Sequence, residues 1–127
     1  MSEIFGNSMY MTQRSLDYLW EKQNVTMQNI ANSDTPGYKA KYVTFEENLA
    51  SNIRQARLKK GLAAVRQGIQ GAQIQVHSTA DASARLDENN VQVDAESVEL
   101  ARTSLQYQYQ LQSLNGDISR LRSVIKG

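Results

Sequence analysis

The stretch NIANSDTPGYKAKYVTFEENL, residues 29–49, marks the place where the chain changes direction. Asn29 and Asn32 are poor residues for continuing a helix, because their side chains bond readily to nearby backbone groups. The only proline of the chain, Pro36, follows them and disfavours helical angles at the residue before it. The sequence therefore predicts that a long helix ends within this stretch and that a turn follows.

The turn is predicted to be of type II, with Pro36 and Gly37 as its two central residues. The second central residue of such a turn has a positive φ, which glycine adopts more easily than a β-branched residue does. The turn would then direct Tyr38 and Lys39 away from the helix at a fixed angle. The complete turn motif consists of Asn29, Asn32, Thr35, Pro36, Gly37, Tyr38 and Lys39.

Apolar residues recur at helical spacing on both sides of the middle of the chain. From about Ser8 to Asn32 the stripe consists of Met9, Leu16, Trp20, Met27 and Ile30, and Leu19 widens it. Near the C-terminus, steps of three and four residues continue without a break through Leu100, Ser104, Tyr107, Leu111, Leu114, Ile118, Leu121 and Ile125. Such a pattern is typical of a coiled-coil seam. Asp94 is well placed to cap the second helix.

The middle of the chain gives weaker signals. Residues 44–47, Thr-Phe-Glu-Glu, have the spacing of a capping box, and a short helix would follow with Phe45, Leu49, Ile53 and Ala56 on one face. Residues 72–77, AQIQVH, alternate in the manner of a short strand. The small and polar residues 78–90 predict a loop.

These elements predict a mainly α fold, in which long N- and C-terminal helices pack antiparallel around a short irregular middle with a small helix and a candidate β element. The chain divides into residues 1–34, 35–93 and 94–127. If each terminal helix covers the other's stripe, some apolar side chains still need cover: Leu19, Trp20, Tyr109 and Val124. A three-helix bundle that is stable as a monomer is the alternative.

The sequence gives no sign of an enzyme or of a cofactor. The chain of 127 residues has no cysteine and a single histidine, His77, so clusters of metal-binding histidines and cysteines are excluded. Residues 87–98 begin like a calcium loop but lack its glycine and its final glutamate. The net charge of +1 gives no general attraction to nucleic acid. The basic stretch at residues 54–66 is short, which favours a solvated helix face over a nucleic-acid site. No apolar run is long enough to span a membrane, and residues 1–20 do not resemble a secretory leader.

Two longer stretches carry a family resemblance. Residues 23–49, QNVTMQNIANSDTPGYKAKYVTFEENL, resemble the signature of flagellar basal-body rod proteins, and residues 89–115 resemble the C-terminal motif of the same family. Ser97-Val98 stands where the family often has a Glu-Met pair, which hardly affects the helix. The short length and the complete Thr-Pro-Gly-Tyr-Lys turn are most similar to the small proximal-rod members.

The resemblance implies a non-enzymatic structural subunit that the flagellar type III apparatus exports to the periplasm without a cleaved signal peptide. Its partners would be copies of itself, other rod proteins, and the membrane-ring, rod-adaptor and export-gate proteins at the rod base. The terminal helices would form an inner tube layer through an assembly seam of Leu16, Leu19, Trp20, Met27, Ile30, Leu100, Tyr107, Leu111, Leu114, Ile118, Leu121 and Ile125. Another small flagellar axial protein, a discrete dimeric adaptor and an anionic-surface binding module remain alternatives.

Overall fold

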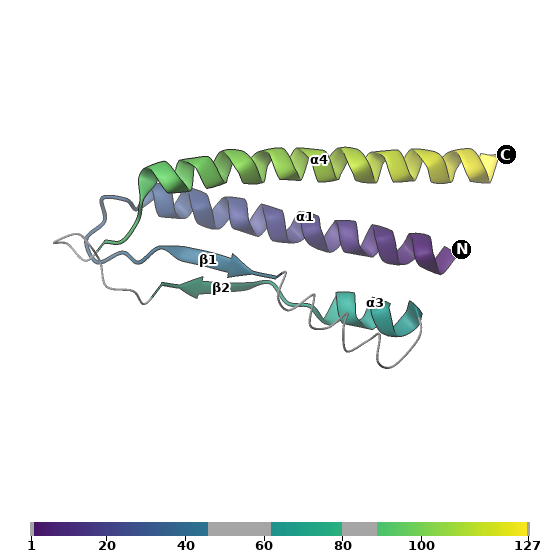
Figure 1. Cartoon of the computed structure of the whole chain (residues 1–127), viewed down its shortest axis with the longest axis horizontal. Coiled ribbons are helices and arrows are strands. Elements are labelled where there is room, and N and C mark those ends of the chain that lie inside the picture. Colours follow the sequence, from purple (N-terminus) through teal and green to yellow (C-terminus); the bar gives the residue numbers. More distant parts are fainter. Residues whose placement is uncertain (1, 46–61, 80–88, 127) are drawn as a thin grey trace.

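The computed structural model of the chain describes residues 2–45, 62–79 and 89–126. This part contains the helices α1 (Ser2–Ala31), α3 (Leu62–Gly71) and α4 (Val93–Lys126), and the strands β1 (Lys41–Thr44) and β2 (Gln75–Ser78). The molecule is elongated, with α1 lying between α4 on one side and the strands and α3 on the other (Figure 1). The predicted fold class, with long terminal helices packed antiparallel and a small β element in the middle, is confirmed.

The two long helices differ slightly from their predicted bounds. α1 begins at Ser2, well before the first residue of the apolar stripe, and ends at Ala31. α4 begins at Val93, and the carbonyl of Gln92 accepts the first helical hydrogen bond, from the amide of Glu96 at 2.9 Å. Asp94 was predicted to cap this helix, and that prediction is wrong. It lies inside the first turn, where its charge still favours the positive end of the helix.

The strands form an antiparallel pair in which Val43 lies opposite Val76 and Tyr42 lies opposite His77. The predicted strand at residues 72–77 is confirmed only for its last part, because β2 starts at Gln75. β1 was not predicted, and Thr44, expected to open a helix, is its last residue. The β-branched and aromatic residues around Thr44 favour a strand once a partner strand is available. The remainder of the predicted helix, with Leu49, Ile53 and Ala56, lies outside the described residues.

α3 was not predicted either. Its ten residues include Gly68 and Gly71, which lower helix propensity and make so short a segment hard to recognise. Val65 and Ile69 are four residues apart and lie on the same face of the helix. Ile69 is buried in the core, and Val65 is partly buried and packs against that core.

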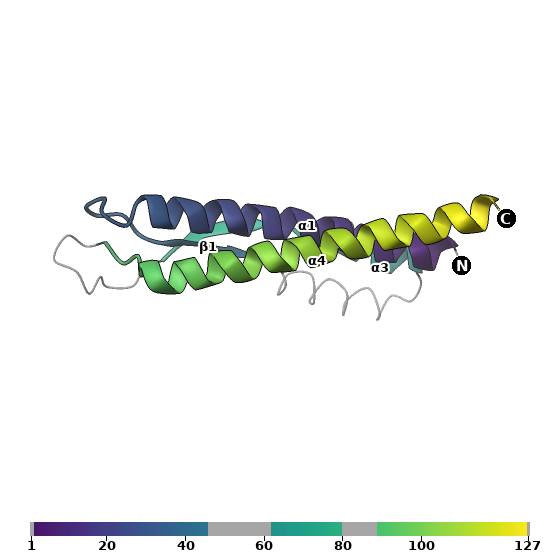
Figure 2. The ribbon, with the colours of Figure 1, turned by 90° about the horizontal axis from the view of Figure 1, so that it is seen from above.

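The hydrophobic core lies between α1 and the layer formed by the strands and α3. Its buried members are Tyr18, Leu19, Val25, Val43, Phe45, Ile69 and Ala72. The two terminal helices pack against each other as expected, but the buried core lies on the other side of α1, and Leu19, expected to need cover, is only 6% exposed. α1 is the middle layer of the molecule and is covered on two sides, whereas α4 runs obliquely along its outer side (Figure 2).

Candidate functional site

A buried asparagine joins the end of α1 to both β1 and α4. Asn29 is 1% exposed. Its side-chain amide donates to the carbonyl of Lys41 at 2.8 Å and to Oε2 of Glu96 at 3.1 Å. Its side-chain oxygen accepts from the amide of Lys41 at 2.9 Å and from the hydroxyl of Tyr38 at 3.3 Å. One side chain therefore uses all of its hydrogen-bonding groups to fix three parts of the chain.

Two further asparagines attach the segment before α4 to the same place. Asn89 donates to the carbonyls of Asn32 at 2.8 Å and Thr35 at 2.7 Å. Asn90 accepts from the amide of Ala40 at 2.6 Å. We call Asn29, Asn89 and Asn90 together the asparagine joint. Because four of these bonds link residues 50 or more positions apart in the sequence, the joint fixes how α1, β1 and α4 leave this end of the molecule.

The hydroxyl of Tyr38, which donates to Asn29 of the joint, must carry its proton. Burial, and secondarily the negative charge of Glu96, raise the pKa of the Tyr38 hydroxyl. The hydroxyl therefore keeps its proton and can donate to the oxygen of Asn29.

The predicted turn is confirmed in its geometry. The amide of Tyr38 donates to the carbonyl of Thr35 at 3.2 Å, and Gly37 has a φ of 74°. Both features are those of a type II turn with Pro36 and Gly37 at its centre. The turn itself is exposed, whereas Tyr38 and Lys39 are half-buried beyond it.

Replacement of Gly37 measures how much free energy the positive φ at this position costs any other residue. A Cβ built at Gly37 meets no atom within 4 Å, so Gly37→Val creates strain but no clash. We expect Gly37→Val to lower the free energy of unfolding by about 1–3 kcal/mol. Gly37→Asn should cost less, because asparagine tolerates positive φ better than other residues. Urea unfolding of both variants measures the difference, and equal losses would argue against the positive φ.

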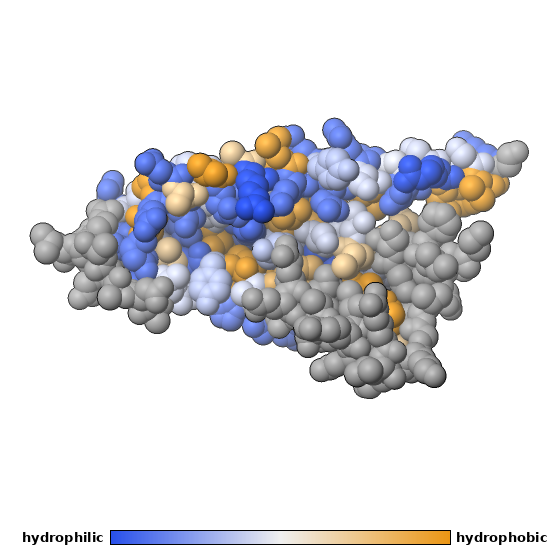
Figure 3. Space-filling view, viewed as in Figure 1, coloured by the Kyte–Doolittle hydropathy of each residue, from blue (hydrophilic) through white to orange (hydrophobic). Residues whose placement is uncertain are grey.

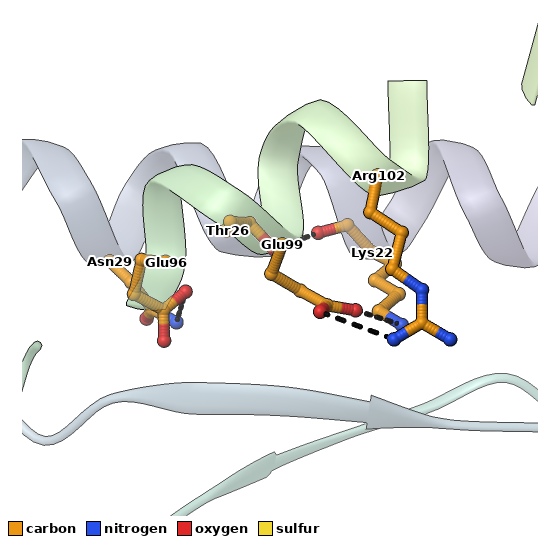
Figure 4. Close-up of polar contacts among 6 residues, drawn as sticks. All are labelled: Lys22, Thr26, Asn29, Glu96, Glu99 and Arg102. Atoms are coloured by element: carbon orange, nitrogen blue, oxygen red, sulfur yellow. Dashed lines mark hydrogen bonds and ion pairs between the residues drawn. The ribbon is translucent and has the colours of Figure 1, made fainter. Parts of the chain in front are cut away.

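Polar contacts hold the first turns of α4 against α1 (Figure 4). The ammonium of Lys22 lies 2.6 Å from a carboxylate oxygen of Glu99, and Arg102 lies 4.0 Å from the other oxygen. The hydrogen bond from Lys22 lowers the pKa of Glu99. Burial alone would lower the pKa of Lys22, but its bond to Glu99 and the nearby charges raise it overall. Both groups are therefore charged at neutral pH.

The contact between the helices continues beyond these charges. Gln23 donates to the hydroxyl of Ser104 at 3.0 Å, and the rings of Trp20 and Tyr107 lie 6.0 Å apart. Residue numbers rise along α4 as they fall along α1, so the two helices are antiparallel. This interface is mixed rather than wholly apolar, and its single fully buried side chain on α4 is the polar residue Thr103.

The residues predicted for the assembly seam fall into three groups. Leu19 is buried in the core of the single chain. A second group is half-buried and consists of Leu16, Ile30, Leu100, Tyr107, Leu114 and Ile118. The third group is exposed and consists of Trp20, Met27, Leu111, Leu121 and Ile125. In the single chain, α1 has buried residues on the side of β1 and α3 as well as on the side of α4, and the part of the seam that would contact neighbouring copies stays a prediction.

An apolar groove of about 670 Å³ lies between α1 and α4. Among the described residues it is lined by apolar side chains that include Met11, Leu19, Phe45, Leu105 and Tyr109. Figure 3 shows hydrophobic groups along α4 and again at its C-terminal end. These surfaces can bind another apolar surface.

The described residues include no group of three or more histidine, aspartate or glutamate side chains that could hold a metal ion. No helix in this part of the chain is long and apolar enough to cross a membrane.

Asn89 and Asn90 were not predicted as parts of the site. Both lie in a stretch that resembles a family motif, and Asn29 was expected only to loosen the end of a helix. The signal that could have revealed the joint is the occurrence of asparagines in both resembling stretches. The structure brings the two stretches together: Asn29 bonds to Glu96, and the amide of Ala40 bonds to Asn90.

Comparisons with known proteins support the importance of this region. The family model described as "Flagella basal body rod protein" matches residues 19–39. This range runs from the buried part of α1 through the type II turn. It therefore includes Asn29 and the contacts of the joint on α1.

Similar proteins also match over nearly their whole length. The flagellar basal body rod protein FlgB of Bacillus subtilis (strain 168) is 32% identical over 98% of this chain and 97% of its own. FlgB of Escherichia coli (strain K12) is 34% identical over 99% of this chain and 98% of its own. FlgB of Aquifex aeolicus (strain VF5) is 25% identical over 96% and 94%. With the joint and the helix pair in place, these matches show that the chain belongs to the FlgB family of structural flagellar basal body rod proteins.

Proposed function

We propose that this chain is a structural subunit of the proximal rod of the bacterial flagellar basal body, which transmits torque and surrounds the export channel. The observation that carries the mechanism is the contrast between the two ends of the helix pair. At the joint, the helices are fixed by buried hydrogen bonds. Along the rest of α4, many large apolar side chains remain exposed in the single chain. A subunit that becomes part of a polymer has both a defined shape and surface left to bury.

The three segments would then have different roles. Residues 1–34 and 94–127 would form the inner layer of the rod, where their exposed apolar residues contact neighbouring subunits. Residues 35–93 would make the outer contacts and set the angle at which the chain leaves that layer. Interlocked helices resist sliding better than flat polar surfaces, because the side chains of one helix fill the spaces of the next. Such packing suits a shaft under torque.

The partners of the subunit would be copies of itself and other rod proteins, together with the membrane-ring, rod-adaptor and export-gate proteins at the base of the rod. The chain would reach the periplasm through the flagellar export apparatus, without a cleaved signal peptide. Neither a cofactor nor a catalytic step is needed for this role.

Substitution of Leu111 tests whether the exposed part of the seam serves assembly. Leu111 is 40% exposed, so Leu111→Asp should leave the single chain folded. In an assembled seam the new charge would be buried, at a cost of several kcal/mol. We expect a strain that carries Leu111→Asp to produce the chain but to lose it from purified basal bodies and to lose swimming.

The neighbouring variant Gln112→Asp is the matched control, because Gln112 is exposed and lies outside the predicted seam. It should swim normally. Normal swimming by the Leu111→Asp strain would contradict a role of Leu111 in assembly. Absence of the unmodified chain from basal bodies would contradict the proposed function itself.

A further inference from the structure

The turn after α1 lies at one end of the molecule, beside the segment that leads into α4 (Figure 1). It consists of two successive turns that share Thr35. The amide of Thr35 donates to the carbonyl of Asn32 at 3.1 Å, and the amide of Tyr38 donates to the carbonyl of Thr35 at 3.2 Å. Residues 34–37 are all exposed. Water competes for bonds in so exposed a segment, and ordering its backbone costs entropy, so these two bonds alone do not fix it.

Asn89 binds both of these carbonyls from the C-terminal half of the chain. Its side-chain amide donates to the carbonyl of Asn32 at 2.8 Å and to the carbonyl of Thr35 at 2.7 Å. Asn89 is completely buried, where a hydrogen bond is stronger than in water. The two donors belong to one planar amide, so they hold the two carbonyls at a fixed separation. Each carbonyl therefore accepts one local bond and one bond from a residue 57 or 54 positions away.

Asn89 is itself fixed by its own segment. Its side-chain oxygen accepts from the amide of Val91 at 2.9 Å, and Val91 is buried. The backbone amide of Asn90 donates to the carbonyl of Tyr38 at 3.3 Å, and its side chain donates to the hydroxyl of Thr79 at 2.6 Å. Because Asn89 is held on both sides, it cannot follow the turn if the turn moves.

We propose that Asn89 is a positioning residue that holds the turn after α1 in one geometry. Pro36 and Gly37 select a type II turn, and Asn89 keeps the turn in that form by fixing two of its carbonyls. Because Asn89 is far away in the sequence, the turn is held only after residues 89–91 have folded against it. This proposal concerns the single chain and does not depend on the proposed function.

Asn89→Asp removes the donors and keeps the rest of the side chain. Aspartate has nearly the same shape and retains the oxygen that accepts from the amide of Val91, but in neither protonation state can it donate to both carbonyls. By NMR hydrogen exchange on the full-length chain, we expect the amides of Thr35 and Tyr38 to exchange at least tenfold faster than in the unmodified chain. Unchanged exchange at these two amides would overturn the proposal, even if the variant were less stable overall.

Asn90→Asp is the matched control, because it makes the same chemical change at the next residue. The side chain of Asn90 contacts no carbonyl of the turn: it accepts from the amide of Ala40 and donates to the hydroxyl of Thr79. The amides of Thr35 and Tyr38 should exchange in this variant at nearly the rates of the unmodified chain. An acceleration as large as that of Asn89→Asp would overturn the role assigned to Asn89.

A double-mutant cycle gives a second measurement that does not introduce a charge. Gly37→Val strains a turn that must keep its positive φ, whereas a turn that is no longer held can relax to a negative φ. Asn89→Ala removes both donors. By urea unfolding, we expect Gly37→Val to raise the equilibrium constant of unfolding by a factor at least threefold smaller in Asn89→Ala than in the unmodified chain. Equal factors in the two backgrounds would overturn the proposal, because the turn would then not depend on Asn89.

Discussion

Asn29→Asp is expected to destabilise the isolated chain by about 3–5 kcal/mol, because a buried amide that donates two hydrogen bonds is replaced by a buried carboxylate next to that of Glu96. Asn29 is almost completely buried, and its amide donates to the carbonyl of Lys41 and to the carboxylate of Glu96. An aspartate at this position cannot donate either bond and would place a second negative charge beside Glu96. Urea unfolding followed by helical circular dichroism measures the loss.

The pH dependence of this variant has a definite sign. Burial and the negative charge of Glu96 would raise the pKa of the new carboxylate in the folded chain above its value in the unfolded chain. A group of this kind costs stability at pH values above its folded pKa and costs less as the pH falls and it takes up a proton. The difference between Asn29→Asp and the unmodified chain should therefore shrink between neutral and mildly acidic pH.

Glu96→Gln should restore part of the stability of Asn29→Asp, because it removes the repulsion between two carboxylates. Coupling between contacting residues is typically about 0.5–3 kcal/mol. Asn115→Asp makes the same chemical change at an exposed position of α4 and should have little effect. If Asn29→Asp were no more destabilising than Asn115→Asp, the buried joint would not exist in solution.

The joint and the turn beside it show which features could be predicted from the sequence and which could not. The type II turn was predictable because its geometry depends on neighbouring residues, Pro36 and Gly37 above all. The partners of Asn29 were not predictable, because Glu96 lies 67 residues away and no local pattern links the two. Local interactions leave a signature in the sequence spacing, whereas a buried hydrogen bond between distant residues does not.

The same distinction explains the outcome for the helices and strands. The two long helices were predicted from apolar spacing, but that spacing does not tell which element covers each side of a helix. α1 has the strand pair on one side and α4 on the other, so its stripe could not be assigned to one partner. β1 was missed because four residues carry little pattern, and its partner strand begins 31 residues after Thr44.

The position of the core leads to the last prediction, which concerns Phe45. This residue is 2% exposed, stacks on Tyr18 with 5.5 Å between the ring centres, and lies 5.6 Å from the guanidinium of Arg14. Phe45→Ala should cost about 3–5 kcal/mol, through the lost burial and the cavity left behind. Leu111→Ala should cost only roughly 1 kcal/mol in the isolated chain, because Leu111 is already 40% exposed.

These two variants distinguish the observed core from one in which the terminal helices stabilise each other alone. In a core of the second kind, Leu111 would matter more than Phe45, which lies just after β1. Because small domains are stable by only about 5–15 kcal/mol, Phe45→Ala should shift the urea midpoint strongly, and Leu111→Ala should hardly move it. Tyr42→Ala provides a control for the loss of an aromatic ring near Phe45, since Tyr42 is exposed on the strand pair. Equal losses for Phe45→Ala and Leu111→Ala would contradict a core that lies mainly between α1 and the strand layer.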